Sequence, residues 1–382
     1  MSYESVDRLQ NVLANEVFHY AIDRKKASGR ALGTIVELIA FYTLSAWGLR
    51  DHILIERALP EFANPDITHN VEYSLHPKKG TGSLKLKSVT LPLTTRKIRK
   101  SIEDLKSKEP KAASALLSKC SLMRNCCVFD ETSSSIKVAH LEEYDSNFCD
   151  LALVELLPKA FAIVECKRVG VEEGMKKGPQ TIEKAKQGAY VARSVSALQK
   201  VRLRDGNIVG VIPGSDGELI CRPHKQFLED IVNGNDPNLL RDFILTIGMV
   251  SNHGNWFTSD NPNKELRVLA HSYDWLVFLT DRAIAQFVQD LLLTPTKSMT
   301  AVRTAFVASY AKDASGKKSK NRFTKVGMDL KAHLALLQYF RGQGDSLDSW
   351  YNVIAPKHGS LTILRQELSL LAKKDWSNIV SL

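Results

Sequence analysis

Two carboxylates and a lysine near the middle of the chain have a spacing that suits hydrolytic chemistry. Asp150 opens an apolar run, and Glu165 closes a second one, Phe161-Ala-Ile-Val164, with Lys167 two residues later. Apolar runs of this length, joined by a polar turn, predict two buried strands. Two carboxylates at adjacent strand ends can share one hard cation, which prefers oxygen ligands. Lys167 is predicted on the same strand face as Glu165, where it can orient or deprotonate water or stabilise a phosphate's charge.

These residues resemble the PD-(D/E)xK nuclease pattern, in which a carboxylate is followed by Glu-x-Lys on a buried strand. Type II restriction endonucleases are its best-known members. The resemblance covers residues 145–195, although Cys149 rather than proline precedes Asp150. It implies Mg²⁺ as the cofactor, held by Asp150, Glu165 and the main-chain carbonyl of Cys166. Lys167 would then position the attacking water.

The pattern of an acidic residue, any residue and a lysine also occurs elsewhere in the chain, so the segment around each match must distinguish between them. Only Glu165 ends an apolar run that predicts a buried strand. The alternative for Glu165 and Lys167 is an ordinary hairpin with both side chains solvated. The other matches lie in polar or helical segments: Asp23-Arg-Lys25, Asp104-Leu-Lys106, Glu109-Pro-Lys111 and Asp329-Leu-Lys331.

Glu37 is a third candidate carboxylate. It is the only charge in residues 32–47, which predict a buried helix closed by Gly48. A charge on an apolar helix costs free energy unless it is paired or binds a metal. In many nucleases of the resembling family a glutamate on an early helix points at the active site, and Glu37 resembles that accessory ligand. The alternative is a salt bridge to Arg30 or Arg50.

The helices and strands predicted around these residues indicate an α/β fold. The resemblance implies a restriction-endonuclease-like core, a mixed central β-sheet flanked by helices. The residues after this core predict an added helical C-terminal lobe. A composition shift at Thr294-Pro295 divides the chain into a core with N-terminal helices, 1–295, and the lobe, 296–382. Helices are predicted over 3–27, 32–47, from Thr94, and over 181–194, 236–249, 326–341 and 359–374; strands over 208–213, 218–221 and 273–280; and a hairpin from 71–75 and 83–89.

Composition narrows the class of protein. With 44% hydrophobic and 25% charged residues, the chain is typical of a globular protein. A net charge of +10 favours a polyanionic partner. The six cysteines form no CxxC pair, which predicts reduced thiols and a cytoplasmic protein and disfavours zinc. The polar N-terminus predicts no signal peptide, and Glu37 inside the longest apolar stretch disfavours a membrane span.

Several polar side chains are candidates for DNA contact. They lie on the helix after Thr94, in the loop and helix after Lys167, in a polar and aromatic segment, and in a basic loop at 312–325. The alternative for each is a solvated face or a packed loop. The candidates are Arg96, Lys97, Lys176, Lys177, Lys184, Asn252, Asn255, Lys317, Lys318 and Lys320.

Together these features predict a Mg²⁺-dependent, site-specific endonuclease of a restriction system that cuts double-stranded DNA. The resemblance implies products with 5′-phosphates and 3′-hydroxyls. A homodimer is expected, because a two-fold dimer matches a palindromic site. A cognate DNA methyltransferase is an expected partner of the same system. The alternatives are a structure-specific or repair nuclease, and a DNA-binding protein whose nuclease-like fold does no chemistry.

Overall fold

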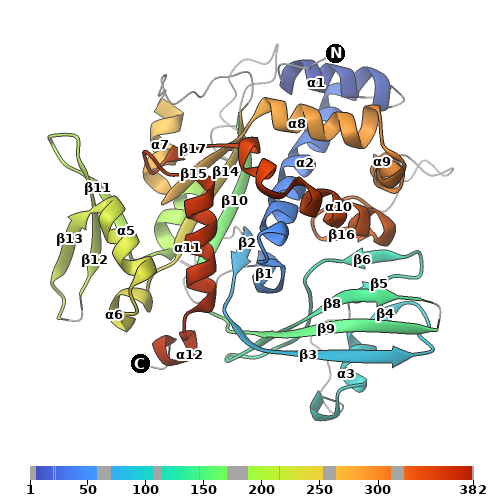
Figure 1. Cartoon of the computed structure of the whole chain (residues 1–382), viewed down its shortest axis with the longest axis horizontal. Coiled ribbons are helices and arrows are strands. Elements are labelled where there is room, and N and C mark those ends of the chain that lie inside the picture. The colour runs from blue at the N-terminus through green and yellow to red at the C-terminus, as the bar shows by residue number, and fades with distance from the viewer. Residues whose placement is uncertain are drawn as a thin grey trace.

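A mixed six-stranded sheet lies at the centre of the molecule, in the order β1-β2-β10-β14-β15-β17 (Figure 1). The neighbours β10, β14 and β15 run parallel, and every other neighbouring pair is antiparallel. The chain therefore has the predicted mixed α/β character. The strands are β1 (Ile53–Arg57), β2 (Val71–Leu75), β10 (Ala162–Val169), β14 (Leu245–Asn252), β15 (Trp275–Leu279) and β17 (Tyr351–Ala355).

The computed structural model describes most of the chain. The described residues are 6–19, 21, 23–57, 70–105, 114–145, 147–169, 188–214, 216–252, 264–310 and 322–380. Among them, none of the helices combines the length and the apolar character that crossing a bilayer requires.

The parallel strands are apolar on both faces, as buried parallel strands are. All five residues of β15 are buried. The helix predicted over 236–249 is wrong: only α6 (Pro237–Leu240) is helical, and β14 follows it. A short apolar run suits a buried helix and a buried strand equally well, so periodicity could not separate them.

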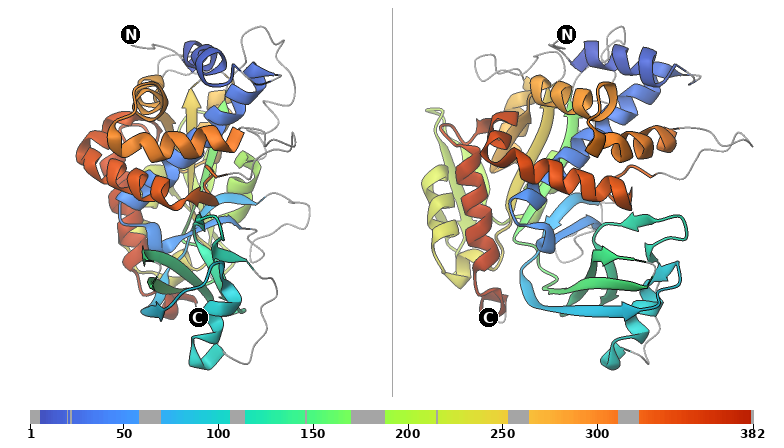
Figure 2. Two further views of the ribbon diagram at one scale, coloured as in Figure 1. Left: turned by 90° about the vertical axis from the view of Figure 1, so that its right-hand side faces the viewer. Right: turned by 45° about the vertical axis from the view of Figure 1, so that its right-hand side comes forward.

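Helices cover both faces of this sheet (Figures 1 and 2). α2 (Arg24–Ala46) crosses one face, and α10 (Leu330–Gln343) packs against α2. Helical residues 188–195 and α7 (Lys264–Ser272) share a core cluster with residues of the other face. The predicted break between helices 3–27 and 32–47 is wrong, because Asp23 caps α2 and the helix continues to Ala46. Gly48, with φ of +82°, follows the helix as predicted.

A β-sandwich is inserted between β2 and β10, over residues 76–161. One sheet has the order β3-β9-β8-β7. The other is β6-β5-β4, to which β16 (Gly327–Asp329) from the C-terminal part of the chain adds an edge strand, and residues of the two sheets share one apolar cluster. The hairpin predicted from 71–75 and 83–89 is wrong, because β2 pairs in the central sheet and β3 pairs with β9. The inserted strands are β3 (Lys78–Lys87), β4 (Leu93–Thr94), β5 (Ala115–Leu117), β6 (Leu122–Arg124), β7 (Cys127–Glu131), β8 (Ile136–Tyr144) and β9 (Phe148–Leu156), with α3 (Thr95–Lys100).

A smaller sheet, β11-β12-β13, projects from the other side of the molecule. Helix α5 (His224–Asn233) packs on one face, where a Cβ on Gly210 would come within 3.2 Å of the Phe227 ring. The strands predicted over 208–213 and 218–221 exist, but they belong to this sheet and not to the core. Its strands are β11 (Gln199–Arg202), β12 (Ile208–Pro213) and β13 (Leu219–Pro223).

The C-terminal residues complete the central sheet. β17 pairs antiparallel with β15, and β16 (Gly327–Asp329) pairs with β6. The predicted helices 326–341 and 359–374 correspond to α10 and α11 (Leu361–Lys373). The central sheet therefore contains residues from both sides of the division predicted at residue 295. The remaining helices are α1 (Val6–Val12), α8 (Asp281–Val288), α9 (Thr300–Tyr310) and α12 (Trp376–Val380), with π turns at Leu13–Val17 and Gln289–Leu293 and 3₁₀ turns at Arg50–His52, Glu103–Leu105, Lys297–Met299 and Gly344–Trp350.

Candidate functional site

Glu165 is fully buried on the strand where its apolar run predicted it. The antiparallel register of β10 and β2 pairs Val164 with Tyr73, which brings Glu72 beside Glu165. The backbone N–H of Glu72 donates a hydrogen bond to Glu165 Oε1 over 3.2 Å. The neighbour of Glu165 on the adjacent strand of the central sheet is therefore Glu72, which contacts it through its backbone.

Asp150 does not take this place. It lies on β9 in the inserted sandwich, where its Oδ2 is 3.5 Å from Lys85 Nζ. β9 and β10 are consecutive in the chain but belong to different sheets, so the predicted meeting of Asp150 and Glu165 at adjacent strand ends is wrong. The segment between them carries the chain from one sheet to the other, and Leu157 N–H bonds the Pro77 carbonyl at 2.9 Å on the way.

Glu37 lies at the same site, and its partner is neither Arg30 nor Arg50. Its Oε2 is 3.3 Å from the Nζ of Lys325. The same ammonium is 3.1 Å from Glu56 Oε1 and also contacts Glu72 Oε1. Arg50 instead pairs with Asp51 and Glu142. Carboxylates from α2, β1 and β2 thus converge on one lysine.

Glu56 reaches the site through an unusual backbone conformation. It has a φ of +53° within β1, between Ile55, which pairs with Tyr73, and Arg57, which pairs with Val71. A positive φ costs a non-glycine residue roughly 1–3 kcal/mol and is common at functional sites. Nothing in the local sequence indicated this conformation, and sequence reasoning missed Glu56, Glu72 and Lys325.

The site is partly closed to water. The side chains of Lys325 and Glu72 are 7% and 8% exposed. Burying a charge is costly unless opposite charges compensate for it, and here three carboxylates contact a single ammonium, while Glu165 is bonded to the backbone of Glu72. Carboxylate oxygens are the ligands that Mg²⁺ prefers, and a cationic group already lies among them, so the donor set fits a divalent cation. That fit is one of ligand type: among the described residues, no group of three His, Cys, Asp or Glu side chains is placed so that it could hold a metal ion as it stands.

The other members of the predicted site follow Glu165 on β10. Cys166 is buried, and the register pairs it with Met249 on β14. Lys167 pairs with Val250, but its side chain lies outside the described part of the chain.

A pocket of about 580 Å³ opens beside Glu37, Glu56 and Lys325. The inserted sandwich supplies its opposite wall, so the pocket lies between the central sheet and the insertion. The remaining lining residues are Thr34, Ala115, Ser118, Leu122, Met123, Arg124, Thr324, Val326 and Gly327.

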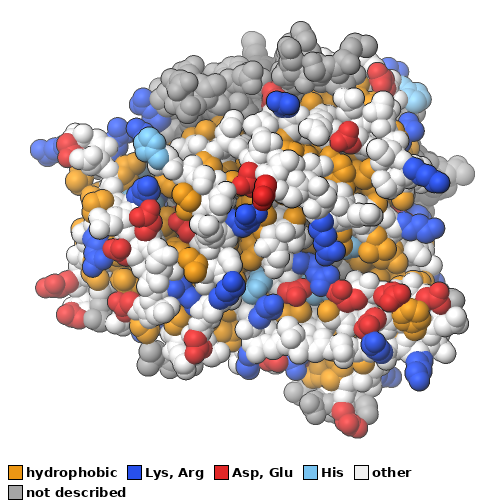
Figure 3. All heavy atoms as spheres, viewed as in Figure 1, with side chains coloured by type: hydrophobic (Ala, Val, Ile, Leu, Met, Phe, Trp, Pro, Cys, Tyr) orange, Lys and Arg blue, Asp and Glu red, His pale blue; other side chains and the backbone are white. Residues whose placement is uncertain are grey.

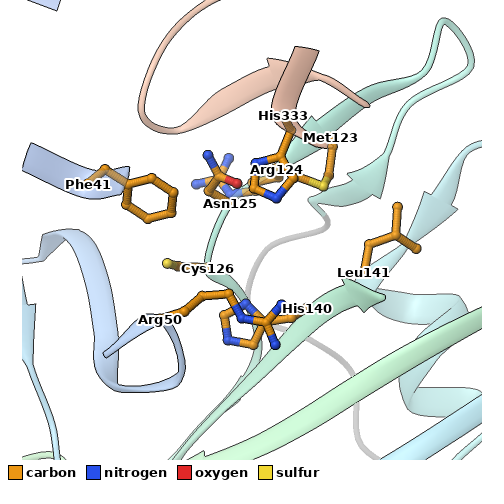
Figure 4. Close-up of a pocket in the computed structure, with 9 residues that line it drawn as sticks. All are labelled: Phe41, Arg50, Met123, Arg124, Asn125, Cys126, His140, Leu141 and His333. Atoms are coloured by element: carbon orange, nitrogen blue, oxygen red, sulfur yellow. The ribbon is translucent and has the colours of Figure 1, made fainter. Parts of the chain in front are cut away.

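A second, smaller cavity lies next to this pocket and shares Met123 and Arg124 with it (Figure 4). Burial, reinforced by the charge of Arg50, lowers the pKa of His140 to about 4 and that of His333 to about 3. Both imidazoles are therefore neutral near pH 7. Asn125 on this wall donates its side-chain N–H to the carbonyl of Lys325 over 2.8 Å.

The candidate DNA contacts are dispersed. Arg96 and Lys97 lie on α3 at the far end of the sandwich from the central sheet (Figure 1), and Thr94 is the N-cap of this helix. On the face in Figure 3, Lys and Arg side chains are spread among acidic ones. Asn252 ends β14, and its side chain is not described. The remaining candidates lie outside the described residues: Lys176, Lys177, Lys184, Asn255, Lys317, Lys318 and Lys320.

The described part of the site combines three glutamates around one ammonium with an adjoining open pocket. No protein-family model matches the chain, and neither a curated protein nor a solved structure matches it.

Proposed function

We propose that this chain is a Mg²⁺-dependent endonuclease that cuts double-stranded DNA, with Glu72 in the role that the sequence assigned to Asp150. The observation that carries the proposal is that Glu72 and Glu165 are neighbours on adjacent strands and that Glu72 shares the ammonium of Lys325 with Glu37 of α2. A glutamate thus takes the first carboxylate position of the pattern, and Glu165 and Lys167 keep the second half.

The order of elements supports the proposed restriction-endonuclease-like core. α2, β1 and β2 come first, then β10, helical residues 188–195 and β14. The first three strands are antiparallel neighbours, and β14 is parallel to β10. This is a mixed sheet flanked by helices, as the resemblance implies. The Glu-x-Lys strand lies at its centre.

The proposed reaction is hydrolysis of a phosphodiester. Glu72, Glu165 and Glu37 would hold the cation, with the Cys166 carbonyl as a further ligand. Bound Mg²⁺ would acidify a water molecule and offset charge on the phosphate. Lys167 would orient that water for in-line attack on phosphorus. The new P–O bond forms as the bond to the 3′ oxygen breaks, which leaves a 5′-phosphate and a 3′-hydroxyl.

Site-specific cleavage of a restriction system is the finer part of the proposal. The inserted sandwich supports it, because it lines the pocket with Ser118 and Arg124. Both side chains can donate hydrogen bonds to phosphates or base edges. The proposed assembly on a palindromic site is a homodimer, with a cognate DNA methyltransferase in the same system.

The decisive experiment compares carboxylate variants in a cleavage assay on phage DNA with Mg²⁺. Glu72→Gln, Glu165→Gln and Lys167→Ala should each lower the cleavage rate about a hundredfold or more, because each removes a group that acts at the reacting phosphate. DNA affinity in a gel shift should change little, since contacts elsewhere dominate binding. Asp150→Asn is the matched control and should cut like the wild type.

The reverse pattern, with Asp150→Asn inactive and Glu72→Gln active, would refute the assignment of Glu72. Discrete fragments from phage DNA would support a restriction enzyme. Cleavage confined to forks or junctions would replace it with a structure-specific nuclease. A metal-independent gel shift without cleavage would indicate a DNA-binding protein that does no chemistry.

A further inference from the structure

Lys325 lies where a cation among the glutamates would have to lie. It comes from the C-terminal part of the chain, yet its Nζ is within 3.3 Å of Glu37 and 3.1 Å of Glu56 and contacts Glu72. Two of these residues, Glu37 and Glu72, are proposed metal ligands. The same oxygens cannot serve an ammonium and a closely coordinated divalent cation together, because the two positive charges repel each other.

The backbone of Lys325 is fixed, whereas space is open to its side chain. Asn125 donates its backbone N–H to the carbonyl of Val326 over 2.9 Å and its side-chain N–H to the carbonyl of Lys325 over 2.8 Å. Thr324 N–H bonds the carbonyl of Gly327 at 2.9 Å and closes the turn that carries the lysine. The pocket of about 580 Å³ adjoins the ammonium. The side chain can therefore leave the carboxylates without unfolding the turn.

We propose that Lys325 is a tethered competitor of the divalent cation. Without the metal its ammonium offsets part of the negative charge of Glu37, Glu56 and Glu72; when the metal binds, the lysine moves out into the pocket. The inference rests on the proposed function and adds to it a residue that regulates metal binding. Lys325 lowers the affinity of the site for metal, and it keeps the buried carboxylates compensated while the metal is absent.

The first test measures Mn²⁺ binding to the full chain by calorimetry, without DNA. Lys325→Met keeps the length of the side chain and removes its charge, so Mn²⁺ should bind about tenfold more tightly than to the wild type. Lys331→Met, at an exposed lysine on α10, is the control and should bind as the wild type does. Unchanged or weaker binding by Lys325→Met would overturn the inference while leaving the metal site intact. If neither protein binds Mn²⁺, the proposed function fails with it.

The second test uses the wild-type protein and so does not depend on the folding of a variant. Reductive methylation followed by mass spectrometry reports how accessible each lysine amine is. Lys325 should be protected without metal and should become several times more reactive at saturating Mn²⁺. The exposed Lys331 is the internal reference and should react equally in both conditions. If Lys325 is methylated to the same extent with and without saturating Mn²⁺, the metal does not displace it.

Discussion

Buried carboxylates in this molecule differ in what compensates their charge. Glu72 has the ammonium of Lys325, and Asp274 accepts hydrogen bonds from His224 and from Thr246. Burial raises the pKa of Asp274, but the bonds and charges of His224 and Lys200 outweigh it and hold that pKa below its usual value. Glu367, on α11, accepts one hydrogen bond, from Trp275 Nε1 at 2.7 Å. The environment of Asp274 favours the ionised carboxylate, whereas that of Glu367 favours the protonated one.

Glu367 makes stability depend on pH. Burial, with smaller contributions from Asp274 and Glu229, raises its pKa from 4.5 to about 7. Because the folded protein binds this proton more tightly than the unfolded chain, the stabilisation is complete below pH 4.5 and is lost as the pH rises through about 7. Glu367→Gln should remove up to about 3 kcal/mol of the difference in unfolding free energy between pH 5 and pH 8.

Urea denaturation at the two pH values measures this difference. Glu218→Gln, at an exposed glutamate, is the control and should keep the wild-type dependence. A Glu367→Gln protein with the full wild-type dependence would show that another group is responsible.

At the scale of elements, the sequence predicted the strand that carries Glu165 but not its neighbours. The apolar run before Glu165 is a local pattern, and so is the helix that carries Glu37. Glu72 is 93 residues away from Glu165, and strand pairing over such a distance leaves no local trace. Asp150 fits the pattern because it is near Glu165 in the sequence. The sandwich inserted between β2 and β10 separates Glu165 from Glu72, its neighbour in the sheet, along the chain. Lys325 and the positive φ of Glu56 are likewise products of tertiary packing.

The parallel pair at the centre of the sheet depends on a glycine. Gly248 on β14 pairs with Glu165, and a Cβ there would come within 2.8 Å of the Tyr273 ring and 3.1 Å of Leu276. Gly248→Ala should therefore lower the free energy of unfolding by about 1–3 kcal/mol, because overpacking a buried site strains its neighbours.

Thermal and urea unfolding test this expectation. Gly82→Ala is the control: it also lies in a strand, but nothing is within 4 Å of its added Cβ, so its effect should stay within about 0.5 kcal/mol. Equal effects of the two changes would mean that the contact with Tyr273 does not limit the packing of β14.

At the scale of the whole molecule, two additions extend the central sheet on opposite sides (Figure 2). The sandwich interrupts the chain between β2 and β10, and β11-β12-β13 follows helical residues 188–195. The chain leaves the central sheet at Leu75 and returns at Ala162, which is its partner in the register. The sandwich therefore connects the antiparallel neighbours β2 and β10, where a short hairpin turn would otherwise join them. That position allows it to approach a substrate without disturbing the strands that carry Glu72 and Glu165.

The basic loop before Lys325 contributes to the net charge of +10, which favours a polyanionic partner. Lys317, Lys318 and Lys320 lie outside the described residues, but the loop ends at the turn that carries Lys325. If these lysines bind DNA phosphates, changing all three to Gln should weaken binding to every sequence alike. The dependence of log K on log salt should become shallower by up to about 0.9 for each phosphate that is no longer neutralised. Sequence preference should survive, because phosphate contacts position the protein and base contacts specify the site.

Fluorescence anisotropy over a salt series, with cognate and random duplexes, measures both quantities. A triple change of the exposed Lys331, Lys357 and Lys373 to Gln alters the net charge equally and is the control. Weaker binding confined to the cognate duplex would place the three loop lysines in a groove, against base edges. An unchanged slope and affinity would mean that the loop stays solvated and that these three lysines do not contact DNA.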